Sequence, residues 1–189
     1  MRVIAGKCRS LPLQSVPGKN TRPTTDRIKE TLFNLIQTYV PEACVLDLFA
    51  GSGALGIEAL SRGAEYAVFV DADRKACEVI KANLAFTHLE DQSSVVQGHS
   101  PDVLHRPELM KKRFDLVFLD PPYGKSLEQE ALLALGESDL VTADTLYVIE
   151  AELSTSFSWL QEYGFRCIKE KVYKTNKHLL IRKEEMESS

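Results

Sequence analysis

From position 44 onward, this 189-residue chain alternates between short apolar runs and segments with helical spacing. The expected strands are 44–49, 66–71, 94–97, 114–119 and 145–151, and the expected helices are 54–62, 74–86, 101–111, 127–137 and 156–163. Strands that alternate with helices favour a parallel sheet whose two faces are both covered by helices. The sequence therefore predicts an α/β fold.

The two ends of the chain depart from this alternation. Residues 165–173 and 178–182 have the composition of strands, and the short connection between them predicts an antiparallel hairpin at the sheet edge. At the other end we expect a basic arm and a helix over 1–38, packed on one domain over 39–183. The last residues, 184–189, are acidic, and we expect a disordered tail.

A glycine turn follows the first expected strand. Val45–Phe49 breaks into Ala50-Gly51-Ser52-Gly53, and a helix is expected next, which is a unit that binds cofactors. With Gly56 the glycines match G-x-G-x-x-G, so a nicotinamide-binding Rossmann protein is one interpretation. The next strand ends at Asp71, about 20 residues further on, where a carboxylate holds ribose hydroxyls. Asp73 can instead cap the following helix.

Asp47 bears on the choice of cofactor because it lies four residues before Gly51. A turn that binds pyrophosphate avoids a nearby anion. S-adenosyl-L-methionine carries a sulfonium cation and an ammonium group and has no phosphate. A carboxylate at this position therefore favours S-adenosyl-L-methionine.

Asp120-Pro121-Pro122-Tyr123 directly follows the expected strand 114–119. The prolines stiffen the backbone and turn carbonyl groups outward beside the carboxylate of Asp120. A carboxylate and a carbonyl can accept both hydrogens of an exocyclic amine, and Tyr123 can cover the attached ring. The tetrapeptide predicts a pocket for a flat, amino-bearing base, with an ordinary strand-ending turn as the alternative. Asp47, Asp71 and Asp120 lie at or near the carboxyl ends of expected parallel strands and should meet in one crevice.

These motifs resemble a known family. Asp47–Gly53 and Asp120–Tyr123 look like the first and fourth motifs of class I S-adenosylmethionine-dependent methyltransferases. Met1–Lys7 and Arg22–Asn34 are similar to the opening of the bacterial family that methylates N2 of a guanine in 16S ribosomal RNA, the small-subunit methyltransferase D family. The likeness covers roughly positions 1–183, and the combination of motifs is specific although each alone is not.

The resemblance implies a fold and an activity. The fold is a Rossmann-like, seven-stranded, mostly parallel sheet in the order 3-2-1-4-5-7-6, with helices on both faces and a short N-terminal extension. The activity is methyl transfer from S-adenosyl-L-methionine to the exocyclic N2 of a guanine, of the guanine-966 type, which leaves S-adenosyl-L-homocysteine. The partner is 16S ribosomal RNA in the small ribosomal subunit or an assembly intermediate, and no metal is expected.

We expect site residues of three kinds. The expected catalytic residues are Asp120, Pro121 and Tyr123; the cofactor-binding residues are Asp47, Phe49, Gly51, Gly53, Asp71, Ala72 and His99; the substrate-binding residues are Arg22, Thr24, Arg27, Pro122, Lys171 and Lys177. His99 stands where the family usually has an adenine-reading Asp, and a solvated loop histidine is the alternative. Asn83 and Glu150 also match family positions, Asn83 as a structural residue and Glu150 as a support behind the site.

The net charge of −4 is unevenly distributed along the chain. Residues 1–30 hold seven basic and two acidic side chains, and residues 165–183 hold seven basic and one acidic, whereas residues 31–164 hold nine basic and 21 acidic. A basic arm and a basic closing hairpin could grip phosphates on either side of the base pocket. A solvated charged surface is the alternative.

The four cysteines fall in no C-x-x-C pair, and no run reaches the roughly 18 apolar residues of a membrane span. We therefore expect a cytoplasmic protein that has no membrane segment. Two other functions stay open beside the dehydrogenase interpretation. An adenine-N6 DNA methyltransferase would use the same Asp-Pro-Pro-Tyr but usually needs a separate target-recognition domain. A non-catalytic RNA-binding protein or regulator could retain the cofactor pocket.

Overall fold

The computed structural model describes residues 1–16, 26–110 and 112–184. Its centre is a seven-stranded sheet in the order β3-β2-β1-β4-β5-β7-β6, in which β7 runs antiparallel to β5 and β6. The strands are β1 (Cys44–Leu48), β2 (Tyr66–Asp71), β3 (Ser93–Gln97), β4 (Phe114–Leu119), β5 (Val141–Glu152), β6 (Phe165–Val172) and β7 (Asn176–Lys183). The expected strand order and closing hairpin are confirmed.

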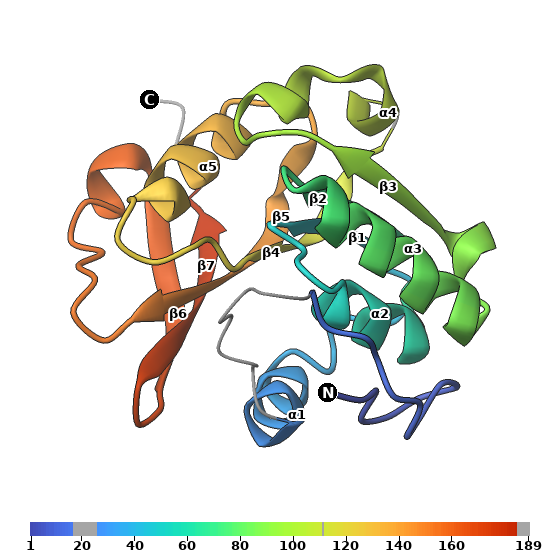
Figure 1. The fold of residues 1–189 in the computed structure, drawn as a ribbon. Coiled ribbons are helices and arrows are strands. Elements are labelled where there is room, and N and C mark those ends of the chain that lie inside the picture. The colour runs from blue at the N-terminus through green and yellow to red at the C-terminus, as the bar shows by residue number, and fades with distance from the viewer. Residues whose placement is uncertain (17–25, 111, 185–189) are drawn as a thin grey trace.

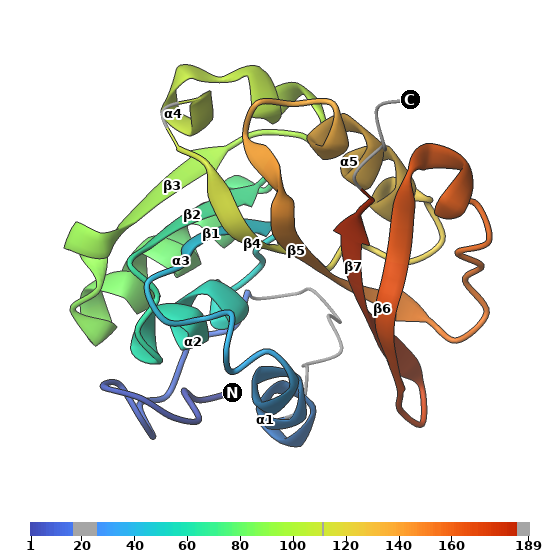
Figure 2. The same cartoon turned by 180° about the vertical axis from the view of Figure 1, so that it is seen from behind.

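Helices cover both faces of the sheet, as Figures 1 and 2 show from opposite sides. The α-helices are α1 (Asp26–Leu35), α2 (Ala54–Ser61), α3 (Arg74–Thr87), α4 (Pro107–Met110) and α5 (Leu127–Gly136), and the short 3-10 turns are η1 (Glu90–Gln92), η2 (Asp102–His105) and η3 (Gln161–Tyr163). The side chains of β4 show how the layers form. Leu116 and Phe118 pack in the core with α1, α2 and α3, whereas Val117 and Leu119 pack with α4 and α5.

A buried carboxylate fastens the N-terminal arm and α1 to α2. Glu58 is fully buried, and its oxygens accept hydrogen bonds from the backbone N–H groups of Ile4 (2.8 Å) and Ala5 (3.0 Å). The Nζ of Lys29, also fully buried, lies 3.1 Å from Glu58 Oε2 and donates a 2.7 Å hydrogen bond to the carbonyl of Arg2. These contacts satisfy both buried charges and fix the arm against the helix that follows the glycine turn.

The expected helix 156–163 is wrong, because only the 3-10 turn Gln161–Tyr163 forms there. The Oγ of Ser156 accepts a hydrogen bond from the N–H of Ser158, and its carbonyl accepts one from the indole of Trp159. Serine hydroxyls that bond nearby backbone groups in this way compete with the helical ladder. The expected helix 101–111 is split into η2 and α4, because Arg106 precedes a proline and is extended.

Within the described ranges, no helix is long and apolar enough to cross a membrane. In the same part of the chain, no three His, Cys, Asp or Glu side chains are grouped so that they could hold a metal ion. The four cysteines are free thiols. The acidic tail from 185 to 189 lies outside the described residues.

Candidate functional site

The glycine turn between β1 and α2 is built from unusual backbone. Phe49 has a φ of +75°, which is rare for an aromatic residue, and its N–H donates to the carbonyl of Val70. Gly51 and Gly53 have φ values of +57° and +77°, which glycine adopts without strain. A Cβ added to Gly51 would meet no atom within 4 Å. The turn therefore presents bare backbone to an open space, which is what the close approach of a cofactor requires.

Two carboxylates use the N–H groups around this turn. Asp71 Oδ2 accepts a 2.9 Å hydrogen bond from the N–H of Gly51, and Asp47 Oδ2 accepts one of 2.9 Å from the N–H of Gly56. A turn that binds pyrophosphate keeps such donors for the ligand. Here both are occupied by anions of the protein itself. The geometry disfavours a dinucleotide and fits a cofactor that carries positive charge and no phosphate.

Asp47 is almost completely buried beneath the first turn of α2. Burial raises the pKa of its carboxyl group to about 7, with a further rise from the charge of Asp71 and an opposing effect of the Gly56 N–H. Because it is buried, Asp47 can reach the cofactor only indirectly, through neighbouring groups such as the Gly56 amide. Asp73 is the N-cap of α3, since its Oδ1 accepts from the N–H of Lys75 at 2.8 Å. The capping interpretation of Asp73 is confirmed.

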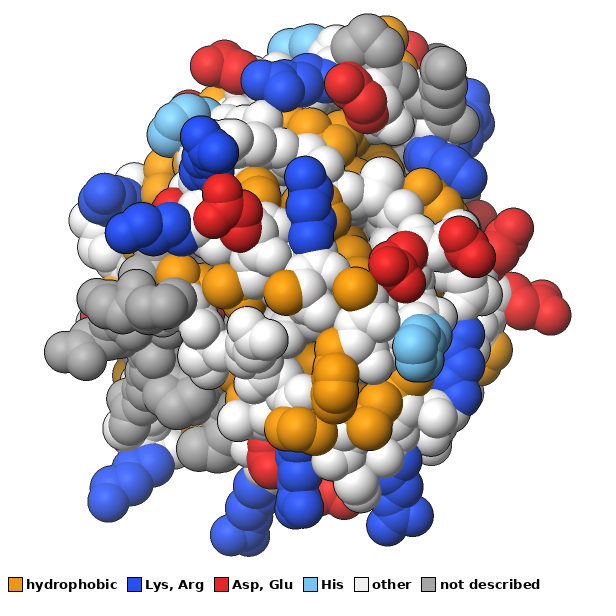
Figure 3. Space-filling model, turned by 45° about the vertical axis from the view of Figure 1, so that its right-hand side comes forward, with side chains coloured by type: hydrophobic (Ala, Val, Ile, Leu, Met, Phe, Trp, Pro, Cys, Tyr) orange, Lys and Arg blue, Asp and Glu red, His pale blue; other side chains and the backbone are white. Residues whose placement is uncertain are grey.

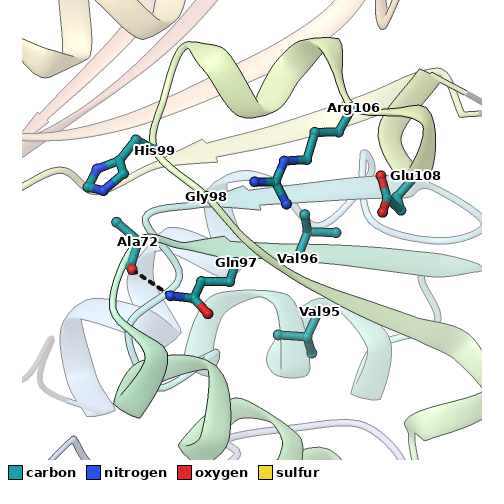
Figure 4. A pocket seen from close by; sticks show the side chains of 8 residues that line it. All are labelled: Ala72, Val95, Val96, Gln97, Gly98, His99, Arg106 and Glu108. Atoms are coloured by element: carbon teal, nitrogen blue, oxygen red, sulfur yellow. Dashed lines mark hydrogen bonds between the residues drawn. The ribbon is translucent and has the colours of Figure 1, made fainter.

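A pocket of about 490 Å³ lies along β3 and the segment that follows it, next to the loop after β2. Figure 4 shows that Ala72 and His99 flank it and that the guanidinium of Arg106 extends into it from the segment after η2. The Nε2 of Gln97 donates a 3.3 Å hydrogen bond to the carbonyl of Ala72. Two residues predicted to bind the cofactor, Ala72 and His99, are thus brought beside Asp71. Arg106 was not predicted, because the sequence alone does not reveal how η2 turns back over β3.

Asp120 lies beside the glycine turn because β4 pairs with β1. Leu119, the residue before it, is in register with Leu48, the last residue of β1. Burial raises the pKa of the Asp120 carboxyl group well above its usual range, and the charges of Glu150 and Asp47 raise it further. The two motifs therefore meet at one edge of the sheet, as the crevice argument predicts.

The other residues of the tetrapeptide differ in exposure. Pro121 is buried, Pro122 is exposed, and 37% of Tyr123 is exposed. The hydroxyl of Tyr123 donates a 3.0 Å hydrogen bond to Glu150 Oε1 on β5. The Tyr123 side chain is thus partly exposed near the carboxylate of Asp120, while its hydroxyl is anchored to the sheet.

Glu150 is the centre of a polar group that we call the Glu150 cluster, which consists of Tyr123, Glu150, Tyr173, Asn176 and His178. Glu150 Oε1 accepts a second hydrogen bond from Asn176 Nδ2 (2.9 Å), and its Oε2 lies 3.0 Å from His178 Nε2. The hydroxyl of Tyr173 lies 3.3 Å from His178 Nδ1. The sequence marked Tyr123 and Glu150 but not the other three members, because only the register of β5 on β7 places His178 opposite Glu150.

Asn83 has the structural role expected of it. Its Nδ2 donates to the carbonyls of Ser52 (2.9 Å) and Gln14 (3.0 Å), and its Oδ1 accepts from the N–H of Gln14 (2.8 Å). One buried amide therefore ties the glycine turn to the N-terminal arm.

The predicted RNA-binding residues that the structure describes lie on three elements, α1, β6 and β7. Arg27 is exposed on α1 and Lys171 is exposed on β6, while Lys177 Nζ lies 5.4 Å from the centre of the Phe157 ring. Figures 1 and 2 show α1 and the tip of the β6–β7 hairpin at the same end of the molecule. Arg22 and Thr24, which were also predicted to bind the substrate, lie outside the described residues.

The face that carries α2 and α3 has a mixed distribution of charge. In Figure 3, basic and acidic side chains are interspersed over the upper part of the view, and Lys and Arg side chains gather along its lower edge. The terminal basic segments are therefore the better candidates for phosphate contacts.

Comparisons with known proteins agree with this site. The chain matches the family model described as "Conserved hypothetical protein 95" over residues 1–182. YlbH of Bacillus subtilis (strain 168) is 42% identical over 150 residues, which cover 79% of this chain and 82% of that protein. The ribosomal RNA small subunit methyltransferase D of Haemophilus influenzae is 39% identical over 153 residues, which cover 80% of this chain and 79% of that protein.

A solved structure shows the same likeness in three dimensions. The Escherichia coli protein yhhF superposes with a TM-score of 0.83 at 33% sequence identity, over 98% of this chain and 99% of that chain. The seven-stranded sheet is thus the class I methyltransferase fold that the motifs implied. Because the similarities span most of each protein, the chain belongs to the ribosomal RNA small subunit methyltransferase D family.

Proposed function

We propose that this protein transfers a methyl group from S-adenosyl-L-methionine to the exocyclic N2 of a guanine in 16S ribosomal RNA, of the guanine-966 type. The name of the relative from Haemophilus influenzae supports methylation of small-subunit ribosomal RNA. The cofactor supplies, when bound, a methyl group activated by a sulfonium. The product is S-adenosyl-L-homocysteine, and the reaction takes place in the cytoplasm.

One observation carries the proposal: the carboxylate of Asp120 lies next to the glycine turn, across the β1–β4 pairing. The charge of Asp47, under that turn, also raises the pKa of Asp120. A methyl donor over Gly51 and an amine held by Asp120 would therefore be neighbours. Fixing two reactants in line can supply about 7–11 kcal/mol of the barrier in favourable cases.

The cofactor is assigned to residues that the glycine turn and the adjoining pocket bring together. Gly51 and Gly53 allow close approach to the backbone, and Asp71 takes the ribose hydroxyls. Ala72 and His99 line the pocket of about 490 Å³, which has room for a flat ring. Phe49 and Asp47 fix the backbone of the turn, Phe49 through its positive φ and Asp47 through its hydrogen bond with the Gly56 N–H.

The amine of guanine is a weak nucleophile because its lone pair is delocalised into the ring. The Asp120 carboxylate and the Pro121 carbonyl would accept its two hydrogens, and these hydrogen bonds strengthen as the nitrogen becomes positive. Burial raises the pKa of Asp120, which makes it a better proton acceptor. Tyr123 would stack on the extruded base, with Pro122 beside it, and such stacking contributes about 1–3 kcal/mol.

The RNA around the base is assigned to the terminal basic segments. Arg27, Lys171 and Lys177 would contact phosphates, together with Arg22 and Thr24 from the segment before α1. Such contacts orient the RNA without reading its sequence. The substrate is small-subunit RNA within the subunit or an assembly intermediate.

The test uses small ribosomal subunits from cells that lack the gene. Purified protein and isotope-labelled S-adenosyl-L-methionine are added, and the RNA is digested and analysed by mass spectrometry. We expect labelled N2-methylguanosine with the wild type, and no label with Asp120→Asn, which should still bind S-adenosyl-L-homocysteine in calorimetry. Label on another atom, or undiminished transfer by Asp120→Asn, contradicts the proposal.

The same material separates the other candidates. Transfer to adenine N6 of DNA would indicate a DNA methyltransferase. Cofactor binding with no transfer to either nucleic acid would indicate a non-catalytic protein.

A further inference from the structure

The Glu150 cluster joins four separate segments at the back of the base pocket. Tyr123 comes from the loop after β4, Glu150 from β5, Tyr173 from the hairpin turn, and Asn176 and His178 from β7. Glu150, Asn176 and His178 are all at least nine-tenths buried, whereas Tyr123 reaches the surface. The cluster thus connects the closing hairpin to the aromatic residue of the base pocket.

The charge of Glu150 fixes the direction of each hydrogen bond. Burial alone would raise the pKa of Glu150, but the hydrogen bond and the charge of His178, with hydrogen bonds from Tyr123 and Asn176, lower it. An ionised carboxylate only accepts, so Tyr123, Asn176 and His178 Nε2 all act as donors. The other ring nitrogen of His178, Nδ1, lies 3.3 Å from the Tyr173 hydroxyl, so the imidazole bridges Glu150 and Tyr173.

The anchor restricts the ring of Tyr123. A tyrosine that is 37% exposed on a loop normally samples several rotamers, whereas this hydroxyl is held at 3.0 Å from a buried anion. Asn176 and His178 immobilise that anion from the opposite strand. The hydrogen bond therefore restrains χ1 of Tyr123 and keeps its ring beside Asp120 before any base arrives.

We propose that Glu150, clamped by Asn176 and His178, is a positioning residue that holds the ring of Tyr123 over the target base. The inference rests on the proposed function, because it assigns the ring to base stacking. It adds that the closing hairpin, through Asn176 and His178, helps to orient the target base. Neither Asn176 nor His178 needs to touch the substrate.

A double-mutant cycle on the single-turnover rate tests this role. A hydrogen bond to a charged group contributes enough to account for at least a tenfold effect, so we expect Tyr123→Phe and Glu150→Ala each to lower the rate about tenfold. The double variant should be no slower than Glu150→Ala, because both changes remove the same restraint. Tyr163→Phe, which alters another half-exposed tyrosine on η3, is the matched control and should keep the wild-type rate.

The conservative variant supplies a readout that a purely structural role would not give. Glu150→Gln can still accept from Tyr123 and Asn176 through its amide oxygen, while its NH2 donates to His178 in the other tautomer. It should recover most of the rate lost in Glu150→Ala. If Glu150 only supported the fold, Glu150→Ala would lower the thermal stability and leave the rate of the folded fraction unchanged.

The outcomes are distinct. Rate losses that multiply to about a hundredfold in the double variant, or a wild-type rate for Tyr123→Phe, overturn the proposal. Because Tyr123 is on the surface, that second result can be obtained even if Glu150→Ala does not fold. If the wild type itself transfers no methyl group to guanine N2, the proposed function fails, and that result is separate from a failure of the cycle.

Discussion

Alanine substitutions at two glycines near the β1–α2 turn allow an effect on cofactor binding to be distinguished from an effect on folding stability. Gly51 has a φ of +57°, and an added Cβ would point into open space. At Gly56, in the first turn of α2, an added Cβ would lie 2.3 Å from Cε1 of the buried Phe69 and 3.2 Å from Asp47 Oδ2. The same methyl group should therefore have opposite consequences at the two positions.

Gly51→Ala should lower the free energy of unfolding by only about 1–2 kcal/mol, which is the strain of alanine in the left-handed region. Its methyl group would occupy the space that we assign to the cofactor. Overpacking there by about 1–3 kcal/mol weakens the binding of S-adenosyl-L-homocysteine by about fivefold to about 150-fold. Gly56→Ala should instead lose about 3 kcal/mol of stability, because Phe69 is fully enclosed and cannot move aside.

The assays are urea denaturation for stability and titration calorimetry with S-adenosyl-L-homocysteine for affinity. Gly63→Ala is the control, because Gly63 also has a positive φ (+103°) and open space at its Cβ but lies after the far end of α2. It should lose stability and keep the wild-type affinity. Wild-type affinity in Gly51→Ala would refute the reasoning, since the cofactor could not then lie over that residue.

Three further predictions concern charges. Lys29→Met should lower the free energy of unfolding in urea by about 2–3 kcal/mol, because it removes one of the two cations that pair with the buried Glu58 among the described residues and leaves only Arg62. Arg74→Met, in an exposed pair, should change it by less than about 0.5 kcal/mol. Glu150→Gln removes one of the charges that raise the pKa of Asp120, so the acid limb of the pH–rate profile should move to lower pH; an unchanged limb contradicts this. Lys171→Ala should reduce the salt dependence of RNA binding by about one unit of slope, and an unaltered slope would remove Lys171 from the phosphate contacts.

Most of the fold could be predicted because its signals are local. In β4, consecutive apolar residues such as Val117 and Phe118 are buried on opposite faces, which is the pattern of a strand covered on both sides. The glycine turn and the carboxylates of Asp71 and Asp120 follow directly from positions at strand ends. The helix expected over 156–163 was wrong, because the hydrogen bonds of Ser156 outweigh the helical spacing of the apolar residues in this segment.

The contributions that depend on register could not be predicted. His178 lies in an apolar run and gives no sign that it faces Glu150, and the pairing of β5 with β7 alone brings them together. Arg106 likewise enters the pocket only because a proline ends η2 and redirects the chain. Both depend on contacts between segments far apart in the sequence, which periodicity does not encode.

The central claim is that the crevice between the glycine turn and Asp120 methylates a guanine amine in small-subunit RNA. Mass spectrometry of 16S ribosomal RNA from cells that lack the gene, complemented with either the wild type or Asp120→Ala, tests it most directly. We predict that one N2-methylguanosine disappears on deletion, returns with the wild type and stays absent with Asp120→Ala. Return of that nucleotide with Asp120→Ala, or an unchanged set of methylated guanines on deletion, would contradict the claim.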